Sequence, residues 1–106
     1  MQLRNLSPAE SHAELCRDSD LIVLDVRTQP EFDRYHVDGA VLLPIQELED
    51  RLDELDVTAR YVVVCEHGVR SAMACDILLS QGFSDLRNVD GGMARWIGEA
   101  VPLLRD

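Results

Sequence analysis

The sequence predicts an α/β fold in which a parallel β-sheet is covered by helices on both faces. Three observations indicate this class: strand and helix patterns alternate along the chain, two four-residue runs are wholly apolar, and two segments carry the same helix-start signature. The apolar runs are 21–24 and 61–64, and continuous apolar character is typical of strands buried on both faces.

Two helix starts can be recognised in the first third of the chain. Segment 7–10 (Ser-Pro-Ala-Glu) places a capping residue, a first-turn proline and an acid in the order that begins a helix, which we expect to run to about Cys16. Segment 28–31 (Thr-Gln-Pro-Glu) repeats this chemistry and predicts a short helix to about Tyr35.

Three further strands are expected beside the two apolar runs. Residues 3–6 form a weak strand pattern, and residues 86–89 form the last one. Residues 40–43 should form a short strand, because a turn at Asp38-Gly39 precedes them and Pro44 follows.

The second half of the chain predicts two more helices before the last strand. Leu48, Leu52 and Leu55 recur at spacings of four and three with acids between them, which marks an amphipathic helix. Residues 72–79 are apolar on most sides, so we expect a helix that is central rather than peripheral, with Gly82 at its C-terminal cap.

Composition limits the classes of function. The 106 residues, 46% of them hydrophobic, suffice for one domain with a single core. The formal net charge is −10 and all basic residues are arginines, so we expect neither nucleic acid nor membranes as partners. No run could span a membrane and the N-terminus lacks a signal-peptide pattern, so the cytoplasm is the expected location. Three cysteines without a Cys-x-x-Cys pair argue against a disulfide framework and a zinc site, and nothing calls for a cofactor or for more than a monomer.

Cys65 is the strongest candidate for a reactive residue. It follows the apolar strand 61–64 and begins the loop 65–71, which leads into the expected helix. Loop amides and the positive end of the helix can surround a thiolate there, and Gly68 permits the positive φ that a tight ring requires. Since a purely structural buried cysteine would not need Gly, His and Arg beside it, we interpret Cys65 as a nucleophile.

Four segments resemble the rhodanese, or thiosulfate sulfurtransferase, family. They occur in the family's order: 24–27 (Leu-Asp-Val-Arg) with 31–32 (Glu-Phe), 36–40 (His-Val-Asp-Gly-Ala), 65–71 (Cys-Glu-His-Gly-Val-Arg-Ser) and 91–96 (Gly-Gly-Met-Ala-Arg-Trp). The third segment is similar to the family's active-site loop. Together the four segments extend over nearly the whole chain.

This resemblance implies that residues 1–106 form a single rhodanese domain, a three-layer α/β/α fold with a five-stranded parallel sheet. It also implies that the Cys65 thiolate takes a sulfane sulfur from a donor such as thiosulfate, becomes a persulfide, and passes the outer sulfur to cyanide or a thiol. Two covalent half-reactions predict ping-pong kinetics. The expected partners are a small-molecule sulfur donor (thiosulfate or a persulfide), a thiol or cyanide acceptor, and alternatively a protein that accepts the sulfur.

The resemblance gives the other loop residues the task of binding sulfur. Their amides would stabilise the thiolate and the persulfide; the residues are Glu66, His67, Gly68, Val69, Arg70 and Ser71. Arg70 either attracts an anionic donor or holds the loop, and His67 either hydrogen-bonds the substrate or faces solvent. Glu66 weakens the attraction for thiosulfate unless it faces solvent, where screening reduces its effect, so a persulfide donor stays an alternative.

Residues outside the loop are expected to support it. Asp25 and Arg27 end another strand at the same edge of the sheet, and we expect their charges to brace neighbouring loops, with Arg27 pairing to Glu31. Direct substrate contact by these two residues is the alternative. His36 is expected to be a hydrogen-bonded scaffold residue, and Trp96 to belong to the core or the pocket wall.

Two other functions stay open at this point. One is a non-enzymatic sulfur-relay or regulatory module, whose acidic surface would suit a basic partner. The other is a phosphatase or arsenate reductase of the same fold. Phosphatases of this fold place five residues between Cys and Arg, whereas four separate Cys65 from Arg70, and Ser71 stands where their arginine would be.

The other two cysteines have weaker claims to a role. Cys75 lies one turn beyond Ser71 and is either a resolving thiol or, as we expect, a small buried apolar residue. Cys16 receives no role.

Overall fold

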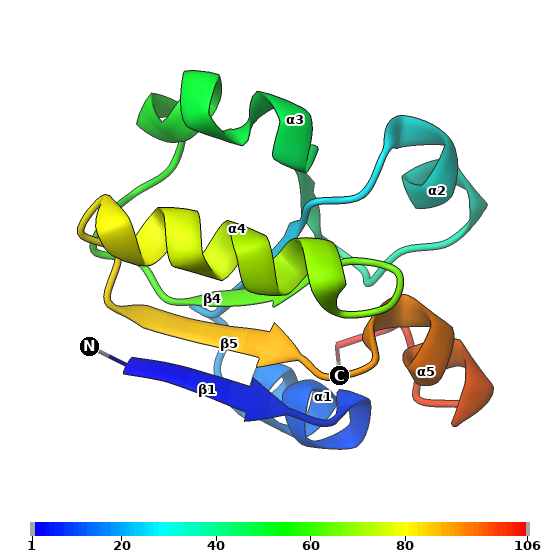
Figure 1. Ribbon diagram of the computed structural model, residues 1–106. Helices are drawn as coiled ribbons and strands as arrows, with labels where there is room; N and C mark the ends of the chain where they lie inside the picture. The colour runs from blue at the N-terminus through cyan, green and yellow to red at the C-terminus, as the bar shows by residue number, and fades with distance from the viewer. Residues whose placement is uncertain (1, 106) are drawn as a thin grey trace.

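The computed structural model describes residues 2–105, which alternate between strands and helices (Figure 1). The strands are β1 (Gln2–Leu6), β2 (Ile22–Asp25), β3 (Val41–Leu42), β4 (Tyr61–Val64) and β5 (Asp85–Val89). The helices are α1 (Pro8–Arg17), α2 (Gln29–Arg34), α3 (Ile45–Leu48), the 3₁₀-helix η1 (Glu49–Glu54), α4 (Val69–Ser80) and α5 (Gly92–Gly98). Among residues 2–105, no helix has the length and apolar character needed to cross a membrane.

All five strands form one parallel sheet in the order β1-β5-β4-β2-β3. The predicted α/β fold with a five-stranded parallel sheet is confirmed. Val63 in the central strand β4 pairs with Leu24 of β2 on one side and with Asn88 of β5 on the other. Asn88 in turn pairs with Asn5 of the edge strand β1, a register that matters for the site described below.

The sheet separates two apolar layers, and alternate residues of a strand enter opposite layers. Val63 of β4 packs with Leu48 of α3 and Leu78 of α4. Val62, its neighbour in β4, packs in the other layer, which contains residues of α1 and α5. Figure 1 shows α3 and α4 on one side of the sheet and α1 with α5 on the other. Cys65 continues the alternation into the layer of α4.

Both predicted helix starts are confirmed in detail. The Ser7 side chain accepts from the Glu10 N–H while the Glu10 carboxylate accepts from the Ser7 N–H, and Thr28 with Glu31 repeats this reciprocal cap. Each reciprocal cap provides hydrogen-bond partners for two backbone N–H groups that a helix start leaves unpaired, which fixes where α1 and α2 begin.

Two expectations about the later helices are wrong. The helix expected through Leu48, Leu52 and Leu55 is divided into α3, which ends at Leu48, and the 3₁₀-helix η1, which is itself kinked at Arg51 (φ −120°, ψ 18°). The helix expected from residue 72 begins earlier, at Val69, since the Gly68 turn lets the chain enter the helix within the loop. It covers one face of the sheet and leaves its outer side exposed, so it is not surrounded by core.

Candidate active site

Cys65 directly follows β4 at the carboxyl edge of the sheet, where the chain turns into α4. The residue is 1% exposed, and its Sγ accepts a hydrogen bond from the Gly68 N–H at 3.0 Å. Gly68 precedes α4 with φ 93°, a left-handed conformation that favours glycine, and a Cβ there would lie 3.2 Å from the Gly91 nitrogen. The turn at Gly68 therefore aims a loop amide at the sulfur.

The second polar neighbour of the sulfur is a side chain. The Cys65 thiol donates to Ser71 Oγ at 3.3 Å, and Ser71 is fully buried. Within the described part of the chain, Gly68 is the one loop residue whose amide donates to the sulfur. The expected ring of amides from Glu66 to Ser71 is thus represented by a single donor, while the next N–H groups open the first turn of α4.

Helix α5 holds the loop from behind. The Met93 N–H donates to the Cys65 carbonyl at 2.8 Å, and the Ala94 N–H donates to the Glu66 carbonyl at 2.9 Å. Gly92 lies against the same carbonyls with φ 63°, and a Cβ at this position would lie 2.5 Å from the Cys65 oxygen. The glycine is required here because the two backbone segments approach too closely for a side chain.

Helix α2 holds the loop from a second side through an ion pair. Arg70 donates to both carboxylate oxygens of Glu31, at 2.7 and 2.8 Å. This arginine lowers the pKa of Glu31 to about 2, against an opposing effect of burial and with help from Thr28. The prediction that Arg27 pairs with Glu31 is wrong: Glu31 binds Arg70, so Arg70 connects the loop to α2.

Strand β2 supplies the third support through the buried guanidinium of Arg27. It donates to Asp25 at 2.8 Å, to Glu66 at 3.1 Å and to the Tyr35 carbonyl at 2.7 Å. Burial opposes its charge, but the hydrogen bonds to Asp25 and Glu66 raise the pKa of Arg27 above its ordinary range. The arginine therefore ties β2, the end of α2 and the loop together, as a brace rather than an exposed anion site.

Glu66 does not face solvent. Its carboxylate accepts from Arg27 and from the Tyr35 hydroxyl, the latter at 3.2 Å. Burial and the Glu66 charge raise the pKa of Tyr35, which keeps this phenol a donor. The charge of Glu66 is consequently offset by a neighbouring cation, and its repulsion of an anionic donor is weaker than an unpaired carboxylate would cause.

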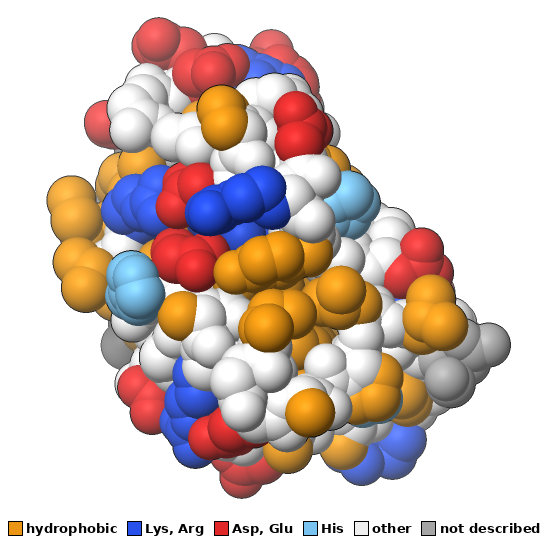
Figure 2. All heavy atoms as spheres, turned by 90° about the vertical axis from the view of Figure 1, so that its right-hand side faces the viewer, with side chains coloured by type: hydrophobic (Ala, Val, Ile, Leu, Met, Phe, Trp, Pro, Cys, Tyr) orange, Lys and Arg blue, Asp and Glu red, His pale blue; other side chains and the backbone are white. Residues whose placement is uncertain are grey.

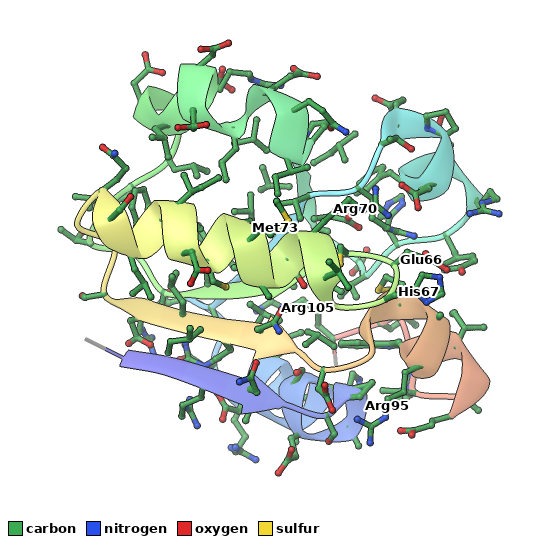
Figure 3. All side chains as sticks on the ribbon, viewed as in Figure 1. Glu66, His67, Arg70, Met73, Arg95 and Arg105 are labelled. Atoms are coloured by element: carbon green, nitrogen blue, oxygen red, sulfur yellow. The ribbon has the colours of Figure 1, made fainter. Side chains whose placement is uncertain are left out.

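His36, His67 and Trp96 lie in three different surroundings. His36 Nδ1 lies 2.8 Å from the Phe32 carbonyl, and its ring stacks on Phe32 with centroids 3.7 Å apart. His67 is exposed beside Glu66 at the loop, where Figure 3 shows both near Arg70. Trp96 is fully buried, as expected of a core residue, and donates to the Pro102 carbonyl at 3.0 Å.

Comparison with known proteins decides the family. The sequence model of the Rhodanese-like domain family matches residues 8–99 of this chain. The chain belongs to this family.

Thiosulfate sulfurtransferase GlpE of Pseudomonas fluorescens is 36% identical over 80% of this chain and 78% of its own length. The protein YtwF of Bacillus subtilis is 32% identical over 96% of this chain and 98% of its own length. Among solved structures, a rhodanese-related protein from Thermoplasma volcanium superposes with a TM-score of 0.84 at 31% identity, covering 93% of this chain and 95% of that one.

Figure 2 shows the side of the molecule on which the chain turns from β4 into α4. On that face, acidic and basic side chains alternate in a belt next to a group of hydrophobic side chains. Two apolar residues of α4, Val69 within the loop and Met73 just after it, are 67% and 55% exposed. They stand one helical turn apart, so the entrance to the loop is flanked by apolar surface.

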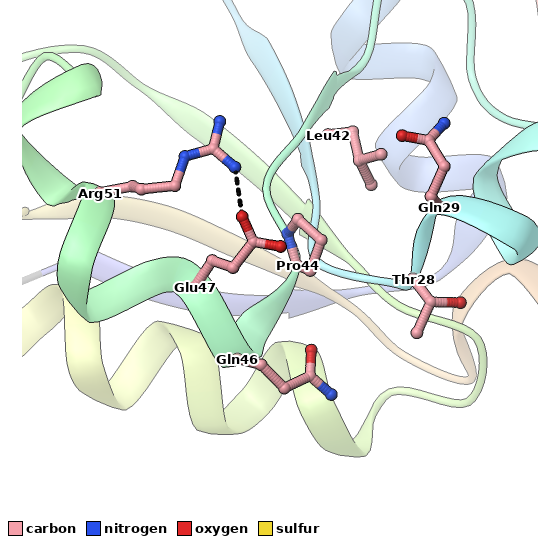
Figure 4. Close-up of a pocket in the computed structure, with 7 residues that line it drawn as sticks. All are labelled: Thr28, Gln29, Leu42, Pro44, Gln46, Glu47 and Arg51. Carbon is pink, nitrogen blue, oxygen red and sulfur yellow. Dashed lines mark hydrogen bonds and ion pairs between the residues drawn. The ribbon is translucent and has the colours of Figure 1, made fainter.

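Cys65, the nucleophile candidate, is not among the residues that line the pocket shown in Figure 4. A cavity of about 450 Å³ is lined by residues of α2, β3, α3 and η1 and their flanks (Figure 4): Thr28, Gln29, Leu42, Pro44, Gln46, Glu47 and Arg51. Its arginine is bound to the Glu47 carboxylate at 2.8 Å. The position of Cys65 in the chain, rather than a pocket, therefore identifies the site.

Sequence reasoning missed several residues of the site. It did not find Asn88, whose Oδ1 accepts from Ser71 Oγ at 2.5 Å, or Tyr35 as a partner of Glu66. It named the Gly91-Gly92 pair but gave no reason for it. An uncharged polar residue in a strand that the sheet buries, as Asn88 is in β5, was the available signal for the first of these.

Proposed function

We propose that this rhodanese-family chain is a sulfurtransferase that works through a Cys65 persulfide. The Cys65 thiolate attacks the outer sulfur of thiosulfate, a new S–S bond forms, and the S–S bond of the donor breaks as sulfite leaves with its electron pair. Cyanide or a thiolate then attacks the outer sulfur of the persulfide. Attack by cyanide yields thiocyanate and returns the Cys65 thiolate.

The observation that carries this proposal is the Gly68 N–H directed at Sγ from the turn that begins α4. A backbone donor 3.0 Å from the sulfur stabilises negative charge on it, and the positive end of a 12-residue helix adds to this effect. The name of the related GlpE, thiosulfate sulfurtransferase, supports thiosulfate as the donor to test first. Because Arg27 pairs with Glu66, that carboxylate repels an anionic donor less than an unpaired one would.

Phosphatase chemistry is less well supported by the loop. A phosphatase arginine must leave its guanidinium free to clamp three equatorial oxygens of a phosphoryl group. In this chain both terminal nitrogens of Arg70 donate to Glu31. The Arg70 guanidinium is therefore occupied by the Glu31 carboxylate of α2, and we expect no turnover of an aryl phosphate or arsenate.

The test is the rate of thiocyanate formation from thiosulfate and cyanide. We expect Cys65→Ser to lose activity to background, because the hydroxyl cannot form the persulfide, while Cys75→Ser and Cys16→Ser retain it. Initial rates at several fixed cyanide concentrations should give parallel double-reciprocal lines, as ping-pong kinetics require. Full activity in Cys65→Ser would refute the assignment.

A second function, sulfur relay to a protein acceptor, is favoured by one observation. Val69 in the loop and Met73 just after it expose apolar side chains, where a partner that accepts sulfur from Cys65 would have to approach. The net charge of −10 suits a partner with basic residues around its thiol. Slow turnover with small acceptors, together with fast transfer to a basic thiol peptide that Met73→Glu abolishes, would select this function.

A further inference from the structure

A chain of side-chain hydrogen bonds leads from the Cys65 sulfur across the sheet. The thiol donates to Ser71 Oγ at 3.3 Å, and the Ser71 hydroxyl donates to Asn88 Oδ1 at 2.5 Å. Asn88 Nδ2 then donates to Asn5 Oδ1 at 3.0 Å. The two asparagines face each other across the β1–β5 register, so adjacent strands hold them at a fixed separation.

Most of the side chains in this series of hydrogen bonds are buried. Cys65 is 1% exposed, Ser71 is fully buried and Asn88 is 6% exposed, while Asn5 lies at the surface on the edge strand. The groups therefore depend on one another for hydrogen bonds, and a donor or acceptor that loses its partner there carries a large penalty.

The directions of these bonds determine what the Ser71 hydroxyl offers to the sulfur. A hydroxyl has one proton to donate and lone pairs to accept. Because the Ser71 proton is directed to Asn88, the serine presents a lone pair to Cys65 and can bind only a protonated thiol. Asn88 can accept from Ser71 because its NH₂ group is directed to Asn5.

We propose that Asn88 is a positioning residue that controls the ionisation of Cys65 through Ser71. In the resting protein it holds the serine as an acceptor, which favours the thiol. When Cys65 loses its proton to the buffer, the sulfur becomes an acceptor only, and the Ser71 hydroxyl turns about its Cβ–Oγ bond to donate to it. Asn88 then loses its donor, so formation of the sulfur anion works against this bond. The inference rests on the proposed function of Cys65.

Other ionisable groups around Cys65 also influence its ionisation but are unchanged in the variants below. They belong to the loop, to α4, to α2 and to the end of β2: Glu66 and His67; Arg70 and Cys75; Glu31; Asp25 and Arg27. Met93, the contact from α5, carries no charge. In variants that introduce no charge, a shift therefore reports on the chain of hydrogen bonds.

The experiment measures the rate of Cys65 alkylation by iodoacetamide as a function of pH, with Cys16 in the same sample as the reference. Asn88→Leu removes the acceptor, so Ser71 is free to donate to the sulfur. We expect alkylation at neutral pH to become roughly five- to tenfold faster, the effect of one net hydrogen bond, and the pH profile to move toward lower pH. Asn88→Asp keeps an acceptor and adds negative charge, and should move the profile the opposite way.

A double variant separates this mechanism from a general loosening of the site. In a Ser71→Ala background, Asn88→Leu should leave the alkylation profile unchanged, because Asn88 acts through the serine. Asn5→Ala, at the surface, should produce a smaller shift in the same direction as Asn88→Leu, which keeps the test valid if a buried substitution prevents folding.

Shifts of the same sign in Asn88→Leu and Asn88→Asp, or an equal effect of Asn88→Leu with and without Ser71, would overturn the inference. Either result leaves the proposed function standing, because that function is judged by sulfur transfer in Cys65→Ser and not by alkylation. Loss of the proposed function would instead appear as transfer that persists without Cys65.

Discussion

Cys65 and Cys75 lie in the same apolar layer beneath α4, at 1% and 0% exposure, yet the two regions around them differ in polar groups. Cys65 Sγ accepts a hydrogen bond from the Gly68 N–H, and the thiol donates to the Ser71 hydroxyl. Cys75 lies in the interior of α4, where backbone N–H groups bond within the helix. Burial, with smaller effects of Asp76 and Cys65, raises the pKa of Cys75 to about 12.

This difference shows that two equally buried thiols can have different polar groups beside the sulfur. A cysteine placed before a helix can use loop amides and the first-turn donors that the helix leaves without partners, whereas one placed two turns later cannot. The loop must then be held in place, and three elements of this chain do so: α5 through its amides, α2 through Glu31 and β2 through Arg27.

The largest expected effect comes from removing the brace beneath the loop while leaving the surroundings of Cys75 intact. Arg27→Met leaves the carboxylates of Asp25 and Glu66 without their cation in a buried place. Loss of one partner from a buried ion pair costs about 3–5 kcal/mol in the free energy of unfolding. Urea denaturation should show a loss of this size, together with loss of sulfur transfer.

Arg51→Met is the matched control, because Arg51 binds Glu47 and Glu54 at the surface. Exposed pairs of this kind contribute about 0–1 kcal/mol. Equal losses in Arg27→Met and Arg51→Met would show that the loop does not depend on the buried brace.

A smaller effect is expected from Gly68→Ala, which tests the amide that distinguishes Cys65 from Cys75. The substitution strains φ 93° and brings a Cβ to 3.2 Å from the Gly91 nitrogen. We expect about 1–2 kcal/mol of destabilisation and a fall in sulfur transfer of roughly tenfold or more, because the donor moves away from the sulfur.

Gly39→Ala provides the comparison, since Gly39 has φ 77° with no atom within 4 Å of an added Cβ. It should show a similar loss of stability from the backbone conformation but unchanged sulfur transfer. Equal losses of activity in the two variants would remove the Gly68 amide from the account.

The smallest expected effect concerns the link between α2 and the loop, and it depends on pH. The folded-state pKa of Glu31 is about 2, below its ordinary value of 4.5. Its contribution to stability is therefore present above about pH 4.5 and is lost as the pH falls toward 2. Glu31→Gln should be less stable than the parent protein at neutral pH, and the difference should shrink over this range.

Urea unfolding at several pH values measures that difference. Glu54→Gln serves as the control, because Glu54 forms a surface pair with Arg51, whose loss should hardly affect stability. A difference between the parent and Glu31→Gln that stays constant down to pH 2 would contradict the assigned pKa.

The fold and the placement of Cys65 at the carboxyl edge of the sheet could be predicted because both depend on local patterns. Apolar runs, capping boxes and the Cys-loop sequence each lie within a few residues, and parallel strands bring their carboxyl ends to one edge. The change from α3 to η1 after Leu48 and the kink at Arg51 could not be predicted in this way, because the leucine spacing continues through both.

The pairing of charges at the site could not be predicted, because it depends on contacts between distant segments. Arg70 and Glu31 are 39 residues apart in the sequence, as are Arg27 and Glu66. With these four groups at one edge of the sheet, sequence alone allows several pairings. Arg27 with Glu31 and Glu66 with Arg70 are each only four residues apart, but neither is the pair formed. Only the tertiary arrangement selects among them.

The most direct test of the account asks which cysteine carries the transferred sulfur. Cleavage after arginine separates the three thiols into peptides 5–17, 61–70 and 71–87, which hold Cys16, Cys65 and Cys75 in turn. After treatment with thiosulfate, mass spectrometry without reductant should find one added sulfur atom on peptide 61–70, and cyanide should remove it. Added sulfur on peptide 71–87, with 61–70 unmodified while thiosulfate is consumed, would contradict the assignment of Cys65 as the nucleophile.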